Sequence, residues 1–412
     1  MKTPHASSSL DLPALESILL AIARSDIPRL SQEPKAVAAQ LSTPLAQLGR
    51  GLTRERRLVR ERYLDDPLIM AAYLLYYLPA NALRIERVLA EIHRIGVFPQ
   101  EDCIRILDLG CGSGAGLVAF TRFLDKTVAS SLANAIHYRG IDRSAKGLDC
   151  LRAFWTKLRE THPEYRRHEV DVRRIGDIRR VILRPTEITA FRPHIVLASY
   201  VFNELFEDRD VSAFADAIHK IMQAMPEESL LIIIEPGLEQ CADRLSRVRE
   251  RLREEGWAVY SPCTHEETCP LVTRTGGQKQ WCHQEVRWKR TPLQQALDGR
   301  AGFRRRSLAF SHLVIGHRGL RRPPDPYPPG KTRCVRALSP ALKAKGRLSS
   351  YVCGEEGLSE LILQHRDRSR LNESFKAIRR GDKIVLEPAG DMGAKTLIGP
   401  DRTIQVIGFD EE

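Results

Sequence analysis

The segment IRILDLGCGSGAG, residues 104–116, decides the fold of this 412-residue chain. Its apolar first half predicts a strand that ends near Asp108. Gly110, Gly112 and Gly114 then allow a tight turn and let a ligand approach the backbone, because glycine has no Cβ. The helix expected after the loop would present N-terminal N–H groups, which bind negatively charged groups. The segment therefore predicts a strand–loop–helix cradle for a ligand.

Strands and helices alternate after this cradle. Apolar strands are expected in HYRGID (137–142), HEVDV (168–172), HIVLASY (194–200) and SLLIIIEPG (229–237). A helical pattern follows each of these runs except HEVDV. Such alternation predicts an α/β fold with a parallel sheet wound by right-handed crossovers. Ligands bind such sheets at the carboxyl ends of the strands. A second apolar-basic run, residues 303–318, is expected to return to the sheet as a further strand.

The acidic residue before the glycines gives LDLGCGSG the form found in class I S-adenosylmethionine (SAM) methyltransferases, which have a Rossmann-like sheet. A lone glycine loop is weak evidence, but the loop, the acidic strand end and the alternating elements agree. This form implies SAM as cofactor and predicts a set of contacts: Asp108 and the three glycines for the methionine and ribose, Asp142 for the ribose hydroxyls, Asp171 for the adenine, and Ser199 above the methyl donor. For Asp171, a role as a surface turn residue is an equal alternative.

Four regions are expected along the chain. Residues 1–95 are predicted to be helical, and residues 96–320 to form the methyltransferase domain with a cysteine-rich insert at 261–284. A Pro-rich basic linker, 321–345, precedes a small β-rich region, 346–412. No apolar run is long enough to span a bilayer, and the N-terminus resembles neither a signal peptide nor a transit peptide. We therefore expect no membrane association.

Positive charge is concentrated in one stretch. The chain carries a net charge of +12, and residues 284–347 alone contain 16 Lys and Arg against three Asp and Glu. A surface this basic attracts polyanions, since neutralised phosphates release their counterions. We predict that the stretch binds RNA, with its densest contacts at Arg304, Arg305, Arg306, Arg321 and Arg322. A merely soluble surface is the alternative.

The cysteines of the insert favour a metal site. Cys263, Cys269 and Cys282 lie within twenty residues, and thiolates so close in a reduced compartment usually share a metal. Candidates for a fourth ligand are Cys334, Cys353, His265 and His283. Zinc accepts mixtures of Cys and His, whereas an iron-sulfur cluster prefers four thiolates, so the residues alone leave the metal open.

At this point the chain resembles a known family, the small-ribosomal-subunit methyltransferase-like proteins of bacteria and mitochondria. The resemblance is carried by AAYLLYYLPAN, ILDLGCGSGAG, SYVFNEL, IIIEPGLEQCADRLSRVRERL, the run from PCTHEETCPL to WCH, GRLSSYVCGEEGLSELILQHR and FKAIRRGD. These pieces follow one another over roughly residues 30 to 385. The cysteine run and the EPG segment are the specific ones, because many methyltransferases share the glycine loop.

The resemblance implies a [4Fe-4S] cluster with a structural role, held by Cys263, Cys269, Cys282 and Cys353. Cys334 falls in no shared motif and ranks second as the fourth ligand, with zinc as the alternative metal. The resemblance also implies the small ribosomal subunit and its rRNA as partners. We expect a monomer away from the ribosome, in the cytoplasm of a bacterium or in the mitochondrial matrix of a eukaryote.

The reaction is not fixed by the motifs. An NPPY-type loop and a catalytic cysteine at the end of the fourth or fifth strand, both used in RNA methylation, are missing. Tyr200, Asn203, Glu204 and Glu235 are the polar candidates near the reaction point, but none is singled out as a base. Three hypotheses stay open: an rRNA methyltransferase, a non-catalytic rRNA-binding assembly factor that keeps the fold, and a small-molecule methyltransferase.

Overall fold

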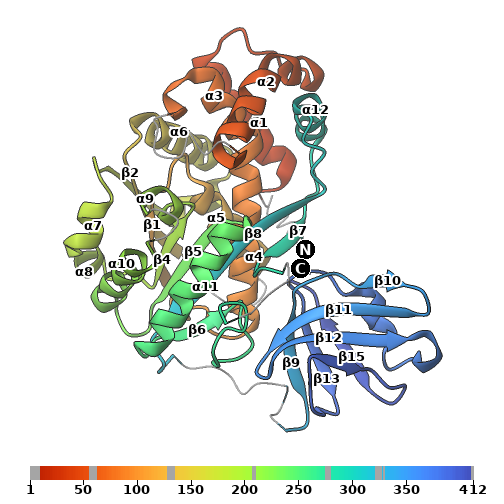
Figure 1. Cartoon of the computed structure of the whole chain (residues 1–412). Helices are drawn as coiled ribbons and strands as arrows, with labels where there is room; N and C mark the ends of the chain where they lie inside the picture. The colour runs from red at the N-terminus through yellow and green to blue at the C-terminus, as the bar shows by residue number, and fades with distance from the viewer. Residues whose placement is uncertain are drawn as a thin grey trace, which may run out of the picture.

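A central sheet with helices on both faces dominates the molecule (Figure 1). The computed structural model describes residues 10–54, 63–127, 135–206, 210–273, 280–320, 327 and 330–409. Its strands run in the order β3-β2-β1-β4-β5-β8-β6, and β7 pairs with β8. Their bounds are β1 Cys103–Leu109, β2 Ala135–Asp142, β3 Glu169–Arg174, β4 Ile195–Ser199, β5 Leu230–Pro236, β6 Ala258–Ser261, β7 Gln284–Arg287 and β8 Ser307–Gly316.

The strand directions identify the fold. Strands β1 to β5 pair in parallel, whereas β8 runs antiparallel to β5, β6 and β7. A reversed strand inserted beside the fifth parallel strand is the arrangement of class I SAM methyltransferases. The predicted fold class is therefore confirmed, and the strand expected in residues 303–318 is β8.

Alternating side chains divide the core into two layers. On β1, Ile104 and Ile106 pack into one hydrophobic cluster and Leu107 and Leu109 into another, because successive side chains point to opposite faces of a sheet. The first layer holds α5 Ala115–Thr127 and α6 Ala145–Thr161. The second holds four further helices: α7 Arg179–Leu183, α8 Thr186–Phe191, α10 Val211–Ala224 and α11 Glu239–Glu254.

The N-terminal region is helical, as the sequence predicted, and its helices extend the first layer. They are α1 Leu12–Asp26, α2 Pro34–Gly49, α3 Pro67–Ala72 and α4 Leu78–Arg94, with the short turns η1 Arg50–Arg54, η2 Tyr63–Asp65 and η3 Tyr73–Tyr77. Within the described residues, one stretch, Pro67–Arg94, is long and apolar enough to cross a membrane, and 83% of its most apolar window is buried inside the protein. Burial of this degree is that of a core helix. Helix α12, Pro292–Ala301, packs at the same end and was not predicted.

A second sheet forms the C-terminal part, drawn in blue in Figure 1. Its order is β14-β12-β11-β9-β13-β15, with β10 paired to β11. The strands are β9 Arg333–Ala337, β10 Leu342–Ala344, β11 Arg347–Gly354, β12 Gly357–Gln364, β13 Lys383–Glu387, β14 Lys395–Leu397 and β15 Thr403–Ile407, with the turns η6 His365–Asp367 and η7 Glu373–Ala377. This sheet starts at Arg333, inside the stretch that the sequence assigned to a linker, because β9 pairs with β11 and β13.

Buried polar contacts join the two parts. Arg336 of β9 donates to Glu91 of α4 at 2.7 Å, and both side chains are about as buried as the hydrophobic core. The same guanidinium donates to the carbonyl oxygen of Pro262 at 2.7 Å. Near the C-terminus, Phe409 returns to the first domain and packs against Phe310 and His312. Because breaking one partner of a buried ion pair is strongly destabilising, these contacts hold the domains in one arrangement.

Candidate functional site

The glycine loop follows β1 and leads into α5. Gly110 and Gly112 have φ values of 73° and 52°, a region that residues with a Cβ rarely adopt. A Cβ at Gly110 would lie 2.4 Å from Cγ2 of Val201, which follows β4, whereas a Cβ at Gly112 would meet no atom within 4 Å. The loop is thus packed tightly on one side at Gly110 and open on the other at Gly112.

Asp108, at the end of β1, supports the loop from below. Its carboxylate is buried and accepts a hydrogen bond of 2.5 Å from the hydroxyl of Tyr138. A Cβ at Gly116 would lie 2.2 Å from its Oδ2, so the first turn of α5 rests directly on this carboxylate. Burial raises the pKa of Asp108 to about 7, although the Tyr138 hydroxyl opposes the rise. Asp108 therefore titrates near neutral pH.

Asp142, at the end of β2, fixes the loop from the side. Its Oδ2 accepts from the backbone N–H of Gly112 at 2.8 Å, and its Oδ1 accepts from that of Ser144 at 2.7 Å. Burial raises the pKa of Asp142, and these two backbone N–H groups counteract the rise. Each carboxylate oxygen keeps a further lone pair, so Asp142 can also accept hydrogen bonds from a ligand.

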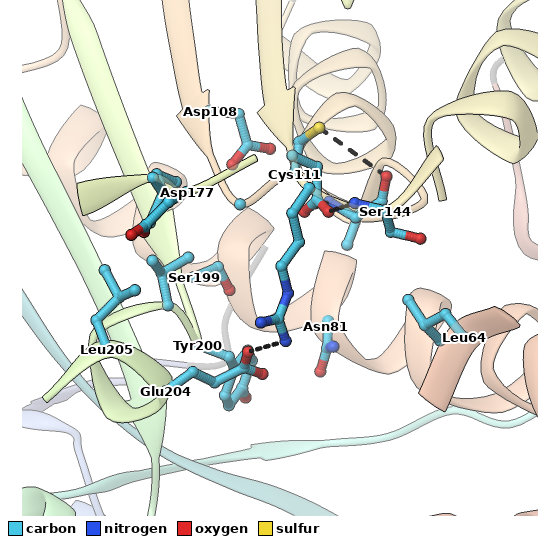
Figure 2. Close-up of a pocket in the computed structure, with 18 of the residues that line it drawn as sticks. Leu64, Asn81, Asp108, Cys111, Ser144, Asp177, Ser199, Tyr200, Glu204 and Leu205 are labelled. Atoms are coloured by element: carbon cyan, nitrogen blue, oxygen red, sulfur yellow. Dashed lines mark hydrogen bonds and ion pairs between the residues drawn. The ribbon is translucent and has the colours of Figure 1, made fainter. Parts of the chain in front are cut away.

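These residues line a cavity of about 410 Å³ at the carboxyl ends of the parallel strands. The cavity lies where the strand order reverses between β1 and β4, the position at which open α/β sheets bind ligands. Figure 2 shows Asp108, Cys111 and Ser144 near one end and Tyr200, Glu204 and Asn81 gathered at the other. Its volume is that of a small-molecule site.

The second end of the cavity carries two of the four polar candidates. Tyr200 follows β4 with a φ of 63°, a strained conformation held by its backbone N–H, which donates to the carbonyl oxygen of Ile234 at 2.7 Å. Glu204 lines the cavity, and burial raises the pKa of its carboxyl to about 7, although Arg143, 3.8 Å away, opposes the rise. Glu235 is fully buried behind them, and its Oε1 accepts from the backbone N–H of Asn203.

Five of the seven predicted cofactor-binding residues line the cavity, and two, Gly114 and Asp171, do not. Asp108, Gly110, Gly112, Asp142 and Ser199 line the cavity. Gly114 has a φ of 97° and belongs to the turn, but it is not one of the described residues that line the cavity.

Asp171 also lies outside the described lining of the cavity. Its Oδ2 is 3.0 Å from Nε of both Arg139 and Arg173. The reason is that β3 continues past Asp171 to Arg174, so the rim of the cavity is formed by the residues that follow the strand. Gly176, Asp177, Ile178 and Arg179 occupy that wall, and no sequence motif pointed to them.

The four cysteines implied by the family resemblance gather at the junction of the two domains. Cys269, Cys282 and Cys353 share a small cluster with Leu271 and Leu338. Burial raises the pKa of the Cys282 thiol, and the neighbouring Cys263 and Cys269 raise it further. The pKa of Cys353 is raised in the same way by burial and by Cys263, Cys269 and Cys282. Cys334 lies on β9, which pairs with the Cys353 strand β11, and there it stands opposite Val385 of β13.

Arg249 of α11 braces this cysteine loop. Its guanidinium donates to the carbonyl oxygens of Glu267 at 2.6 Å and His265 at 3.2 Å. His265 Nε2 lies 3.6 Å from the Cys353 sulfur, whereas His283 stacks on Trp281. Among the residues that the structure covers, no three Cys, His, Asp or Glu side chains stand closely enough to hold one metal ion.

The predicted RNA-binding arginines are arranged differently from one another. Arg304 and Arg306 are exposed, whereas Arg305 is half-buried with its guanidinium carbon 4.5 Å from the ring centre of Phe303. Its backbone N–H donates to Asp298. Arg305 therefore packs in part against the aromatic core. Arg321 and Arg322 lie outside the described residues.

Comparison with known proteins gives one family match. The model of the family described as "Mitochondrial small ribosomal subunit Rsm22" matches residues 67–384, more than three quarters of the chain. Among curated proteins, no significant match is found.

Several solved structures are similar at low identity. A class I SAM-dependent methyltransferase of Listeria monocytogenes is 11% identical, with a TM-score of 0.35 over 76% of this chain and 91% of that one. The methyltransferase domain of a bacterial Hen1 is 13% identical, with a TM-score of 0.32 over 57% and 99%. Loganic acid methyltransferase with S-adenosylhomocysteine is 11% identical, with a TM-score of 0.31 over 59% and 93%.

Proposed function

Because the chain belongs to the Rsm22 family of the mitochondrial small ribosomal subunit, we propose that it binds SAM and acts on small-subunit rRNA. The observation that carries the cofactor assignment is the 410 Å³ cavity formed by the glycine loop at the strand-order reversal. The family match carries the assignment of the partner. A small-molecule methyltransferase would leave both this match and the basic stretch at residues 284–347 unexplained.

The residues of the cavity fit SAM. Gly112 leaves open space where a side chain would otherwise stand, and the buried hydroxyl of Ser199 has no hydrogen-bond partner within the described part of the chain. The carboxylates of Asp108, Asp142 and Glu204 line the same space, and negative charge complements a sulfonium cation. These features support a ligand with positively charged groups and several hydroxyl and amine donors.

Each of these residues has a proposed role. SAM supplies a methyl group on a positively charged sulfur. Asp142 accepts hydrogen bonds from the ribose hydroxyls, and the N-terminus of α5 faces the negatively charged end of the ligand. Asp108 holds the loop and the first turn of α5 in place. Ser199 donates or accepts at the wall beneath the reacting end.

The two remaining hypotheses differ at the other end of the cavity. If the protein is an enzyme, Glu204 is the best-placed proton acceptor, since it lines the cavity and its pKa is about 7. If it is an assembly factor, the same end only closes around the cofactor. The test is transfer of a tritiated methyl group from SAM to small subunits isolated from a strain without the protein. Label that is incorporated by the parent and lost in Glu204→Gln supports the enzyme, whereas binding without label supports the assembly factor.

We also propose that Cys263, Cys269, Cys282 and Cys353 hold a [4Fe-4S] cluster with a structural role. The Cys353 thiol interacts electrostatically with Cys263, Cys269 and Cys282, which supports one shared group at these four residues. A cluster prefers four thiolates, and the family resemblance favours it over zinc. Arg249 beside them would offset the negative charge of four thiolates.

The family membership also bears on the location of the protein. The family description supports the mitochondrial matrix as the location in a eukaryote, and the cytoplasm is the corresponding place in a bacterium. We propose that the protein is a monomer away from the ribosome and does not associate with membranes.

A further inference from the structure

A second hollow, larger than the cofactor cavity, lies between the two domains. This interdomain groove has a volume of about 1020 Å³. One wall is built from α1, α4, α5 and the segment around β7, and includes Arg87, Arg287 and Lys289. The other wall belongs to the C-terminal domain and includes Arg379 and Arg380. Lining residues of the groove come from α4, the segment around β7 and the C-terminal domain, which is drawn in blue in Figure 1.

The charge of this groove is strongly one-sided. Of the described residues that line it, nine are Lys or Arg and two are Glu. Ion pairs within reach of the groove join Arg122 to Glu86, Arg380 to Glu285 and Arg290 to Asp298. The lining itself therefore holds more cationic than anionic side chains. Lys289 follows β7 and Arg306 precedes β8, and both side chains are exposed. The backbone N–H of Trp288 donates to the carbonyl oxygen of Arg306, which holds the two segments side by side.

We propose that the interdomain groove is an anchoring site for the phosphate backbone of an RNA segment. This inference rests on the proposed function, which makes small-subunit rRNA the partner. The groove is at the upper limit of small-molecule sites, about 300–1,000 Å³, and is not closed by one domain. Seven of its nine cationic lining residues, among those described, are arginines. The planar guanidinium binds phosphate through two hydrogen bonds. The family match to the small ribosomal subunit favours rRNA as the polyanion over an acidic protein surface.

Helix α4 separates this site from the cofactor cavity. Asn81 lines the cavity, whereas Pro79, Leu83 and Arg87 line the groove. At about 100° per residue these three positions lie on the face of the helix opposite Asn81, and the helix is about 10 Å wide. The groove therefore anchors RNA on one side of α4. A nucleotide that receives a methyl group must reach the cavity on the other side of this helix.

The experiment compares two double variants of the full chain that each remove two exposed cations. The first pair, Lys289→Gln with Arg306→Gln, lies in the groove. The second pair, Arg180→Gln on α7 with Arg184→Gln at the C-cap of this helix, lies outside both hollows and is called the α7 variant. The probes are deproteinised small-subunit rRNA and intact small subunits, titrated over a salt series. Calorimetry with SAM checks that each variant is folded, since neither pair lines the cofactor cavity.

The groove variant should lose roughly tenfold in rRNA affinity at 0.15 M salt, and its salt slope should fall by about 1.4 units, 0.7 for each lost contact to a single strand. SAM affinity should stay at the parent value, and the α7 variant should bind rRNA like the parent. An equal loss of rRNA affinity in both variants, or no loss in either, would overturn the proposal that the groove binds RNA. Loss of binding to intact subunits with unchanged binding to naked rRNA would mean that a ribosomal protein occupies it, which also overturns the proposal. If the parent itself fails to bind rRNA, the proposed function fails first.

Discussion

The cofactor cavity and the interdomain groove are built in opposite ways. The cavity takes most of its lining from the segments that follow β1, β2, β3 and β4, and a single motif at residues 104–116 supplies its base. The groove joins residues as distant as Leu12, Arg122, Lys289 and Arg380, which no single motif contains. A short-range site can therefore be recognised in sequence, whereas a long-range site exists only after the domains are packed together.

The two sites also depend on different supports. The cavity rests on hydrogen bonds made by Asp108 and Asp142 within one domain. The groove depends on the position of the C-terminal domain, which is fixed by the buried pair of Arg336 and Glu91 and by the cysteine cluster at the junction. Changes at the one site should leave the other intact, and the predictions below test this independence.

The largest effect is expected from Gly110→Arg. The new Cβ would collide with Val201 at a φ of 73°, and the side chain would fill the space of the ligand, so SAM binding should fall below calorimetric detection. Binding to rRNA should persist. Gly256→Arg is the matched control, because Gly256 has a φ of 92° but open space around its Cβ position. It should cost about 1–2 kcal/mol of stability and leave SAM affinity unchanged. Equal SAM affinity in parent and Gly110→Arg would remove the loop from the site.

Cys353→Ser should produce the reverse pattern. Loss of one thiolate should release the cluster, because metal binding and folding are coupled. Anaerobically purified parent should contain iron and sulfide in equal amounts, and the variant should contain neither. The C-terminal sheet should become more sensitive to protease and rRNA affinity should fall several-fold, while SAM affinity stays unchanged.

Cys334→Ser on the adjacent strand is the control for the metal and should retain iron, sulfide and protease resistance. Stoichiometric zinc without sulfide in the parent would overturn the cluster. Loss of metal from Cys334→Ser but not from Cys353→Ser would overturn the choice of the fourth ligand.

A smaller effect should appear in the pH dependence of cofactor binding. The pKa values of Asp108 and Glu204 are each raised to about 7 by burial, so both carboxyls gain negative charge as the pH rises through neutrality. The affinity for SAM, a sulfonium, should therefore rise from pH 6 to 8 relative to that for uncharged-sulfur S-adenosylhomocysteine. A constant ratio of the two affinities would show that neither carboxylate acts on the sulfur.

The same titrations have a consequence for stability. Between the ordinary carboxyl pKa, about 4, and pH 7, the folded protein holds protons that the unfolded chain has released. The free energy of unfolding of the unliganded protein should therefore fall as the pH rises through this window. Asp108→Asn should flatten the dependence.

The smallest effect should separate Asp171 from Asp177. Asp171 pairs with Arg139 and Arg173, whereas Asp177 lines the cavity beyond β3. Asp177→Asn should weaken SAM binding a few-fold, and Asp171→Asn should change it less than twofold. The opposite order would restore the adenine contact that the sequence assigned to Asp171.

The limits of the sequence argument follow from the same contrast. The parallel strands in their order along the chain and the glycine loop were predictable, because a local apolar run or a set of glycines encodes each of them. The shift from Asp171 to residues 176–179 was not, because it depends on how far β3 extends. The start of the second sheet at Arg333 was also hidden, since β9 is defined by its partners β11 and β13 within a basic, Pro-rich stretch. Arg305, predicted as an RNA contact, packs against Phe303 and the rings of Tyr76 and Tyr77, because the fold brings η3 beside the segment after α12.

The most direct test of the account is co-sedimentation of the purified full chain with isolated ribosomal subunits in sucrose gradients, with SAM present. The account predicts that the protein travels with small subunits and not with large subunits. It also predicts that Lys289→Gln with Arg306→Gln weakens this association, whereas Arg180→Gln with Arg184→Gln does not. Association with neither subunit, or equal association with both, would contradict the central claim that this SAM-binding fold acts on the small ribosomal subunit.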